Sequence, residues 1–146
     1  MIIKFYGVRG SIPVPGPTTL KYGGNTSCVY VELDNGQNII FDAGTGLRLL
    51  GQELIKTKVP INIVLSHSHW DHIQGYPFFA PIYQPDRELN IYTNIASGQN
   101  LLCSLFEQMD GSNFPIKADE LPSHNSCVFK GTESVFYEKG LNLIKK

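Results

Sequence analysis

A short apolar run that ends in a cluster of histidines most constrains how this chain can fold. Residues 61–65 are apolar apart from Asn62, and they lie between Pro60 and the polar Ser66, which is typical of a short strand covered on both faces. The segment His67-Ser68-His69-Trp70-Asp71-His72 follows at once, and it holds three of the four histidines of the chain. The sequence therefore predicts a buried strand with metal-ligating side chains gathered at its end.

The spacing within this cluster indicates a metal site. His67 and His69 are two residues apart, and in extended chain residues i and i+2 point the same way, so both imidazoles face one point. Asp71 and His72 come just after the chain turns and can address a second point nearby. Imidazole and carboxylate together favour zinc, with iron or manganese as alternatives. The competing interpretation is a polar loop with coincidental histidines or an adventitious metal site.

The rest of the chain alternates between strand and helix patterns. Strands are expected over residues 2–7, 27–33, 38–41, 61–65 and 88–93, and helices over 47–56, from about Asp71 or His72, and from about Ser97, a candidate N-cap. The segments 127–130, 134–138 and 141–144 are further strand candidates. This order predicts an α+β fold in which helices cover a mixed sheet.

Length and composition bound the class of protein. The 146 residues suffice for a single domain, 1–146, with a hydrophobic core. The net charge of −1 gives no global attraction to nucleic acid or an anionic membrane, and no apolar run is long enough to cross a bilayer. The three cysteines are far apart, which favours reduced thiols in a cytoplasmic protein.

Several motifs together resemble one protein family. The segment from His67 to Gly75 resembles the metal-binding loop of the metallo-β-lactamase superfamily, and residues 41–46 resemble its strand-end motif. Residues 7–13 and 22–28, Gly-Val-Arg-Gly-Ser-Ile-Pro and Tyr-Gly-Gly-Asn-Thr-Ser-Cys, resemble a branch of that superfamily. That branch contains phosphodiesterases of cyclic phosphodiesters and relatives of the transfer-RNA 3′-processing endonuclease, and the resemblance runs from about residue 2 to 92.

The resemblance implies a fold and a reaction. The fold would be the αββα sandwich, of which this chain holds the N-terminal half with its mixed sheet and flanking helices. His67 and His69 would bind a first zinc ion, Asp71 and His72 a second, and Asp71 is the candidate catalytic residue. A hydroxide held by the metals would attack a phosphodiester while the metals neutralise the developing charge.

Two further residues are candidates with open alternatives. The resemblance implies that Asp42 supports the metal loop through hydrogen bonds, whereas the residues alone also fit an aspartate that caps the helix after it. Arg9 lies in a glycine-flanked turn and could meet a substrate phosphate with its planar guanidinium. A solvated or salt-bridged arginine is the alternative.

The chain also departs from the family. Members continue into a second half that supplies another histidine for the first metal, a bridging aspartate, a final histidine and the second sheet; these residues are not found here. The competing explanations are a truncated chain, a half-domain completed by self-association or by a partner chain, and a non-catalytic relative. Hydrolysis of a small phosphodiester is the expected function. Another ester or thioester, a nucleic acid substrate and a non-catalytic metal-binding or interaction half-domain are the alternatives.

Overall fold

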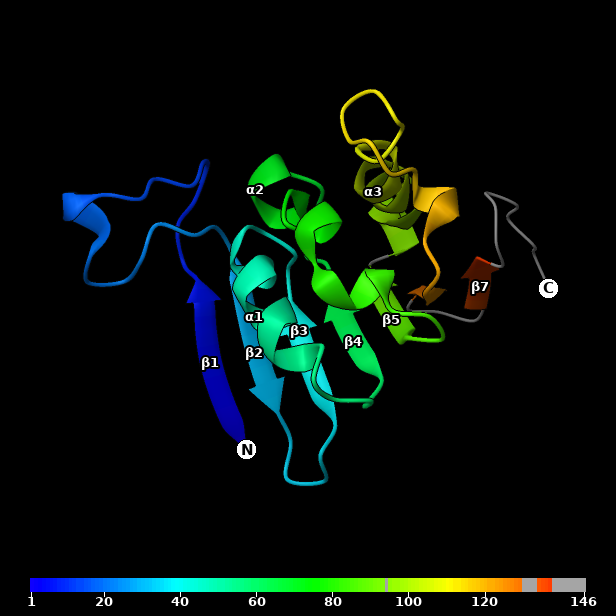
Figure 1. Ribbon diagram of the computed structural model, residues 1–146, viewed down its shortest axis with the longest axis horizontal. Helices are drawn as coiled ribbons and strands as arrows, with labels where there is room; N and C mark the ends of the chain where they lie inside the picture. The colour runs from blue at the N-terminus through cyan, green and yellow to red at the C-terminus, as the bar shows by residue number, and fades with distance from the viewer. Residues whose placement is uncertain (94, 130–133, 138–146) are drawn as a thin grey trace.

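One mixed sheet organises the molecule. The computed structural model describes residues 1–93, 95–129 and 134–137, and within these ranges seven strands form one sheet in which each strand pairs with the next along the chain (Figure 1). β1 to β3 are antiparallel, β3 to β6 are parallel, and β7 returns antiparallel. The strands are β1 (Ile2–Gly7), β2 (Cys28–Glu32), β3 (Asn38–Phe41), β4 (Ile61–Val64), β5 (Glu88–Thr93), β6 (His124–Phe129) and β7 (Ser134–Tyr137).

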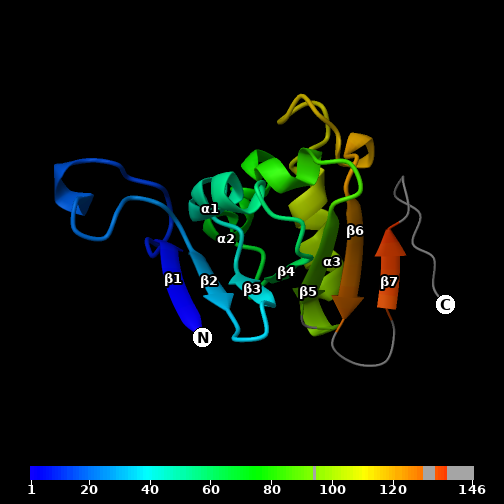
Figure 2. The same cartoon turned by 60° about the horizontal axis from the view of Figure 1, so that its bottom comes forward.

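The helices gather on one face of this sheet, as two views show (Figures 1 and 2). The α-helices are α1 (Gly46–Leu54), α2 (Trp70–Ile73) and α3 (Ile95–Glu107). Short 3-10 turns connect them: η1 (Pro17–Thr19), η2 (Tyr76–Phe78), η3 (Ala80–Tyr83) and η4 (Ala118–Glu120). The fold is therefore α+β with a mixed sheet and flanking helices, as the sequence predicts.

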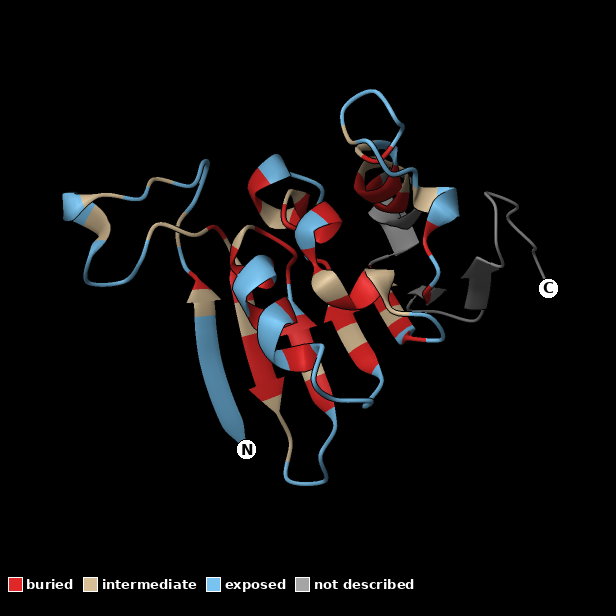
Figure 3. Ribbon diagram, in the orientation of Figure 1, coloured by how far each residue is buried: buried red, intermediate tan, exposed pale blue. Residues whose placement is uncertain are grey.

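The alternation of side chains along the strands explains why the helices cover that face. Ile61 and Ile63 of β4, and Leu89 and Ile91 of β5, point to the helices and are buried. They belong to one hydrophobic cluster with the apolar stripes of the helices, which are formed by Leu47, Leu50 and Leu54 and by Leu101, Leu102 and Leu105. Figure 3 shows this buried layer running from β2 to β5. The core holds β3 and β4 rigidly, and both strands end at the histidine cluster.

The opposite face of the sheet carries apolar side chains in solvent. Ile3 and Phe5 of β1 are 50% and 68% exposed, and Phe41 of β3 is 43% exposed. The pairing of the strands places them on the same face, because Phe5 stands opposite Val29, and Val29 stands opposite Phe41. This face of the sheet therefore exposes several apolar side chains side by side.

The structure also corrects details of the predicted elements. α3 begins at Ile95, so Ser97 lies inside the helix and is not its N-cap. β6 begins at His124, three residues earlier than expected, because it extends along β5 from Glu88 onwards. The strand expected over 141–144 lies outside the described residues. In the described part of the chain, the helices are all too short or too polar to cross a membrane.

Candidate metal centre

The cluster forms where two parallel strands end. Asp42 follows β3 directly, and the histidine segment follows β4 after Leu65 and Ser66. Because β3 and β4 are parallel neighbours, their carboxyl ends lie at the same edge of the sheet. Two backbone hydrogen bonds hold the segments together: the amide of Asp42 donates to Val64 O (2.9 Å), and the amide of Ala43 donates to His72 O (2.7 Å). The fold thereby brings Asp42 next to His72.

The structure gathers the four predicted ligands. The ring centroids of His67 and His69 are 4.5 Å apart, and those of His67 and His72 are 4.1 Å apart. Asp71 lies in the first turn of α2, and its Oδ2 atom is 3.4 Å from Nε2 of His72. A distant loop completes the arrangement, since the backbone amide of Ser11 donates a hydrogen bond to Oδ2 of Asp71 (2.8 Å).

The carboxylate of Asp42 accepts hydrogen bonds from three neighbouring residues. Its Oδ1 atom accepts from the backbone amide and the hydroxyl of Ser66, at 2.9 and 2.7 Å. Its Oδ2 atom accepts from Nδ1 of His72 at 2.8 Å and from the hydroxyl of Ser27 at 3.2 Å. Asp42 is only 7% exposed and has a left-handed φ of 63°. This backbone conformation is unfavourable for a residue other than glycine, and it persists because the surrounding structure holds it in place. At Asp42 the four hydrogen bonds do so.

These bonds determine which ring nitrogens carry protons. A carboxylate only accepts, so Nδ1 of His72 must donate to Asp42, and the lone pair of a neutral ring then sits on Nε2. The single hydroxyl proton of Ser66 goes to Asp42, so Ser66 Oγ can only accept from Nδ1 of His67, 2.9 Å away. Asp42 therefore places the lone pair of a neutral ring on Nε2 in both histidines, directly in His72 and through Ser66 in His67.

The donor set fits zinc by its chemistry, because neutral imidazole nitrogens and a carboxylate are the ligands that zinc prefers. The number of ligands around any one point is lower than a closed zinc site needs. Among the residues that the structure describes, no group of three or more histidine, cysteine, aspartate or glutamate side chains is positioned to hold one ion. The residues thus offer prepared nitrogen lone pairs at the end of β4, and they do not by themselves form a closed coordination shell.

The pKa of the Asp71 carboxyl lies below its ordinary value, chiefly because the backbone amide of Ser11 donates to the carboxylate, with smaller help from His72 and His67. A lowered pKa adds stability above the unfolded-state value, about 4, and that stability is lost as the pH falls through the folded-state value. We expect Asp71→Asn to be less stable than the wild type at pH 6 in the absence of metal, and the difference to shrink below pH 4. Urea unfolding at both pH values measures this, and a difference that grows on acidification would contradict it.

The other sequence candidates have distinct surroundings. Arg9 is half-buried, its Nε donates to the carbonyl of Ile12 at 3.0 Å, and it makes no salt bridge within the described residues. Trp70 stands 66% exposed beside the cluster. The side chain of His124 lies outside the part of the chain whose side chains are described. The structure therefore brings together His67, His69, Asp71, His72 and Asp42, and the loop that carries Arg9 reaches them through Ser11.

Sequence reasoning missed the hydroxyl and amide groups that position the cluster. Ser66 and Ser27 both bond to Asp42, and Ser11 bonds to Asp71. Ser66 stands directly before His67, so its position could have been noted. The contributions of Ser27 and Ser11 depend on how the loop between β1 and β2 lies against Asp42 and against α2, which single-sequence patterns do not specify.

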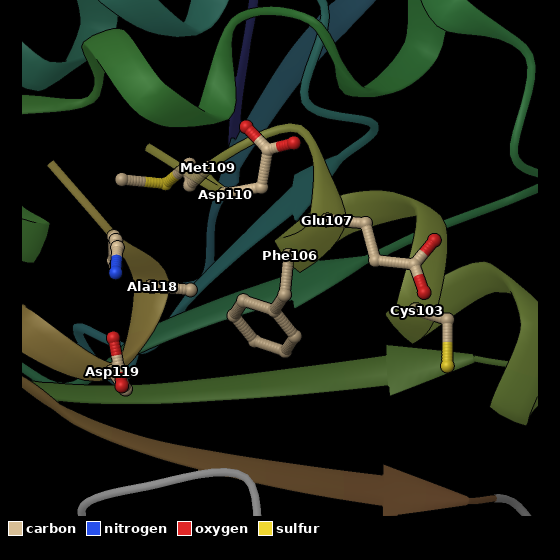
Figure 4. A pocket seen from close by; sticks show the side chains of 8 residues that line it. Cys103, Phe106, Glu107, Met109, Asp110, Ala118 and Asp119 are labelled. Carbon is tan, nitrogen blue, oxygen red and sulfur yellow. The ribbon is translucent and has the colours of Figure 1, made fainter. Parts of the chain in front are cut away.

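A separate cavity lies away from these residues. It measures about 260 Å³ and lies between the end of α3 and η4, and Figure 4 shows carboxylates at its edge and an apolar floor. Phe106 and Met109 contribute to the floor, and Glu107, Asp110 and Asp119 are the carboxylates. None of the residues that the sequence singles out for the metal centre lines this cavity.

Comparison with known proteins agrees with the cluster. No curated protein sequence matches the chain. The model of the Metallo-beta-lactamase superfamily matches residues 22–90, which extend from the turn before β2 into β5 and include Asp42 and the whole histidine segment. This superfamily typically binds metal ions, often zinc, so the match suggests a metal-dependent hydrolase. Residues 22–90 thus carry the sequence pattern of the Metallo-beta-lactamase superfamily.

Proposed function

We propose that this chain contributes to a metal-dependent phosphodiesterase. The observation that carries the proposal is the set of hydrogen bonds that link Asp42 to His72 and, through Ser66, to His67. They orient two neighbouring imidazoles, whose ring centroids are 4.1 Å apart. A polar surface loop would not need a buried carboxylate to orient its histidines. The hydrogen bonds that orient these histidines therefore support metal binding over a coincidental cluster.

The residues have separate roles in the proposed reaction. His67 and His69 would hold one ion, and Asp71 and His72 a second, with zinc the proposed metal and iron or manganese the alternatives. When bound, the metal supplies a Lewis acid that activates water and neutralises charge on the phosphoryl group. Asp71 is also the proposed catalytic residue. Its carboxylate is ionised at neutral pH, and its lowered pKa keeps it ionised at more acidic pH as well, so it can hold a metal or accept a hydrogen bond from the attacking water.

The choice of a phosphodiester rests on segments outside the histidine motif. The 7–13 and 22–28 segments, which resemble the phosphodiesterase branch, both contact the cluster: Ser11 donates to Asp71, and Ser27 donates to Asp42. These two contacts support a phosphodiester as the proposed substrate. Hydrolysis of a thioester or another ester stays the alternative, since the same metal chemistry serves it.

The test combines metal content with turnover. Purified protein is dialysed exhaustively, its metal is counted by mass spectrometry, and hydrolysis of bis(p-nitrophenyl) phosphate is compared with that of thioester and lactone substrates. Close to two retained ions per chain and phosphodiester turnover that a chelator abolishes are expected. His67→Ala and His69→Ala should lose metal and activity, whereas His124→Ala, which changes the histidine outside the 67–72 segment, should keep both. Metal-saturated protein that hydrolyses no phosphodiester would contradict the proposal.

The exposed apolar face favours a second candidate, an interaction half-domain. Ile3, Phe5 and Phe41 are exposed on one face of the sheet, and a face of this kind marks an interface. A second copy of the chain or a completing partner would cover it, and could also supply further metal ligands. Sedimentation velocity on the same preparation distinguishes the two: a stable oligomer that stays inactive when saturated with metal supports the second candidate. An active monomer excludes it.

We also propose that the protein works in the cytoplasm. Cys28 is buried, Cys103 is half-buried, and both are free thiols, as a reducing compartment would keep them.

A further inference from the structure

The loop between β1 and β2 contains a pocket. It measures about 370 Å³ and is formed by two segments, 8–10 and 18–23. The loop is held in shape by hydrogen bonds: the amide of Arg9 donates to Asn25 O (3.0 Å), and the amide of Gly23 donates to Thr19 O (2.7 Å). The Thr19 hydroxyl adds a bond to Val14 O (2.8 Å). The pocket is thus a property of an ordered loop, which projects from the sheet beyond β1 (Figure 1).

Two cations line this pocket without a carboxylate partner. The Nε atom of Arg9 donates to Ile12 O, which fixes the guanidinium and leaves its two terminal nitrogens without a partner in the described part of the chain. The ammonium group of Lys21 lies 4.9 Å from the centre of the Tyr22 ring and makes no salt bridge with a described residue. No acidic side chain is among the residues that line the pocket. Two positive charges in one concave site repel each other, so an anion is the ligand that complements them.

The pocket adjoins the proposed reaction site through the backbone. Arg9 is two residues before Ser11, whose amide donates to Asp71 Oδ2 at 2.8 Å. Ser11 has a left-handed φ of 72°, so the chain turns sharply at the point where it contacts the metal loop. The side of the pocket that carries Arg9 is therefore joined to the metal loop by a short stretch of backbone, from Arg9 to Ser11.

We propose that Arg9 and Lys21 bind a second phosphate group of the substrate, one that is not cleaved. This inference rests on the proposed phosphodiesterase function and adds a substrate class to it: phosphodiesters that carry a further phosphate. The planar guanidinium of Arg9 suits two phosphate oxygens, and the Lys21 ammonium adds a point charge. The pocket thereby favours a 5′-phosphorylated dinucleotide over the same dinucleotide without its terminal phosphate.

Binding is tested first, without turnover. Inorganic pyrophosphate is titrated into the full chain, zinc-loaded and again after chelation, and backbone amide shifts are followed by NMR. Saturable shifts at residues 8–10 and 18–23 are expected in both states. Arg9→Gln and Lys21→Gln should each weaken binding about tenfold, as loss of a charge-assisted hydrogen bond does. Arg48→Gln and Lys58→Gln, which remove the same charges elsewhere on the surface, should not. If all four variants weaken pyrophosphate binding equally, the effect comes from the overall charge of the protein, and Arg9 and Lys21 do not form a specific phosphate site.

Turnover then tests the link to the substrate. The kcat/KM values of zinc-loaded protein are compared for the dinucleotides pdTpdT and dTpdT. A preference for pdTpdT of about tenfold is expected, and Lys21→Gln but not Lys58→Gln should bring the ratio towards one. Hydrolysis of both dinucleotides at equal rates would overturn the inference and leave the phosphodiesterase function standing. Pyrophosphate binding in the pocket with no hydrolysis of either dinucleotide, by protein that does hydrolyse bis(p-nitrophenyl) phosphate, would overturn the assignment to a substrate phosphate and leave the phosphodiesterase function standing. Loss of hydrolysis of every phosphodiester would refute the proposed function as well.

Discussion

Replacing Asp42 with asparagine is expected to weaken metal binding by about 10- to 100-fold, although the two side chains have the same shape. The amide and hydroxyl of Ser66 both donate to Oδ1 of Asp42, so the asparagine oxygen must take that position. Its NH₂ group then faces Nδ1 of His72, where the wild type has an acceptor. The ring must change tautomer, which moves its proton to Nε2 and removes the lone pair that a metal would use.

The backbone should tolerate this change, because asparagine is one of the few residues that adopts the left-handed φ of 63° found at position 42. Asp86→Asn is the matched control: Asp86 also has a left-handed φ, 58°, and lies before β5, at the opposite end of the strands. Zinc affinity is measured by competition with a chromophoric chelator. Unchanged affinity in Asp42→Asn would show that the carboxylate does not orient the ligands, and a similar loss in Asp86→Asn would point to a general effect of charge.

How well the sequence predicts the structure depends on the range of the interactions involved. The β1 to β5 strands and α1 follow from local alternation and helical spacing, so the predicted and observed boundaries agree within two residues. The N-cap predicted for α3 is wrong, because Ser97 has the chemistry of an N-cap but the helix begins at Ile95 and Ser97 lies within it. A capping preference is worth about 1 kcal/mol, which tertiary packing of an apolar helix can outweigh.

In the candidate site too, the features set by local spacing could be predicted from the sequence, and those set by long-range contacts could not. The four predicted ligands lie within six residues, so spacing alone was enough to group them. The link from Asp42 through Ser66 to His67 requires β3 and β4 to be parallel neighbours, and the bond from Ser11 to Asp71 joins residues 60 positions apart. These contacts result from the order of strands in the sheet. Periodicity indicates that a strand exists and does not say which strand lies beside it.

The close contact between the metal loop and the turn after β3 leads to the second large effect, in Gly75→Ala. Gly75 follows α2, and its amide donates to Ala43 O at 2.8 Å. A Cβ atom at position 75 would lie 1.9 Å from Gly44 O and 2.6 Å from Gly44 C. Both obstacles are backbone atoms, which cannot rotate away as a side chain can. The backbone angles of Gly75, φ −82° and ψ −14°, are ordinary for alanine, so the cost arises from the clash alone.

We expect Gly75→Ala to lower the free energy of unfolding by about 3 kcal/mol, the upper end for overpacking in a rigid core. Gly10→Ala is the control, because a Cβ atom there meets nothing within 4 Å, and its stability should stay close to that of the wild type. Urea unfolding followed by circular dichroism measures both. The clash also pushes the histidine segment away from Asp42, so folded Gly75→Ala protein should bind zinc more weakly than Gly10→Ala. Equal stability of the two variants would mean that the turn after β3 does not pack against α2 this closely, and the support that Asp42 gives to His72 would lose its structural basis.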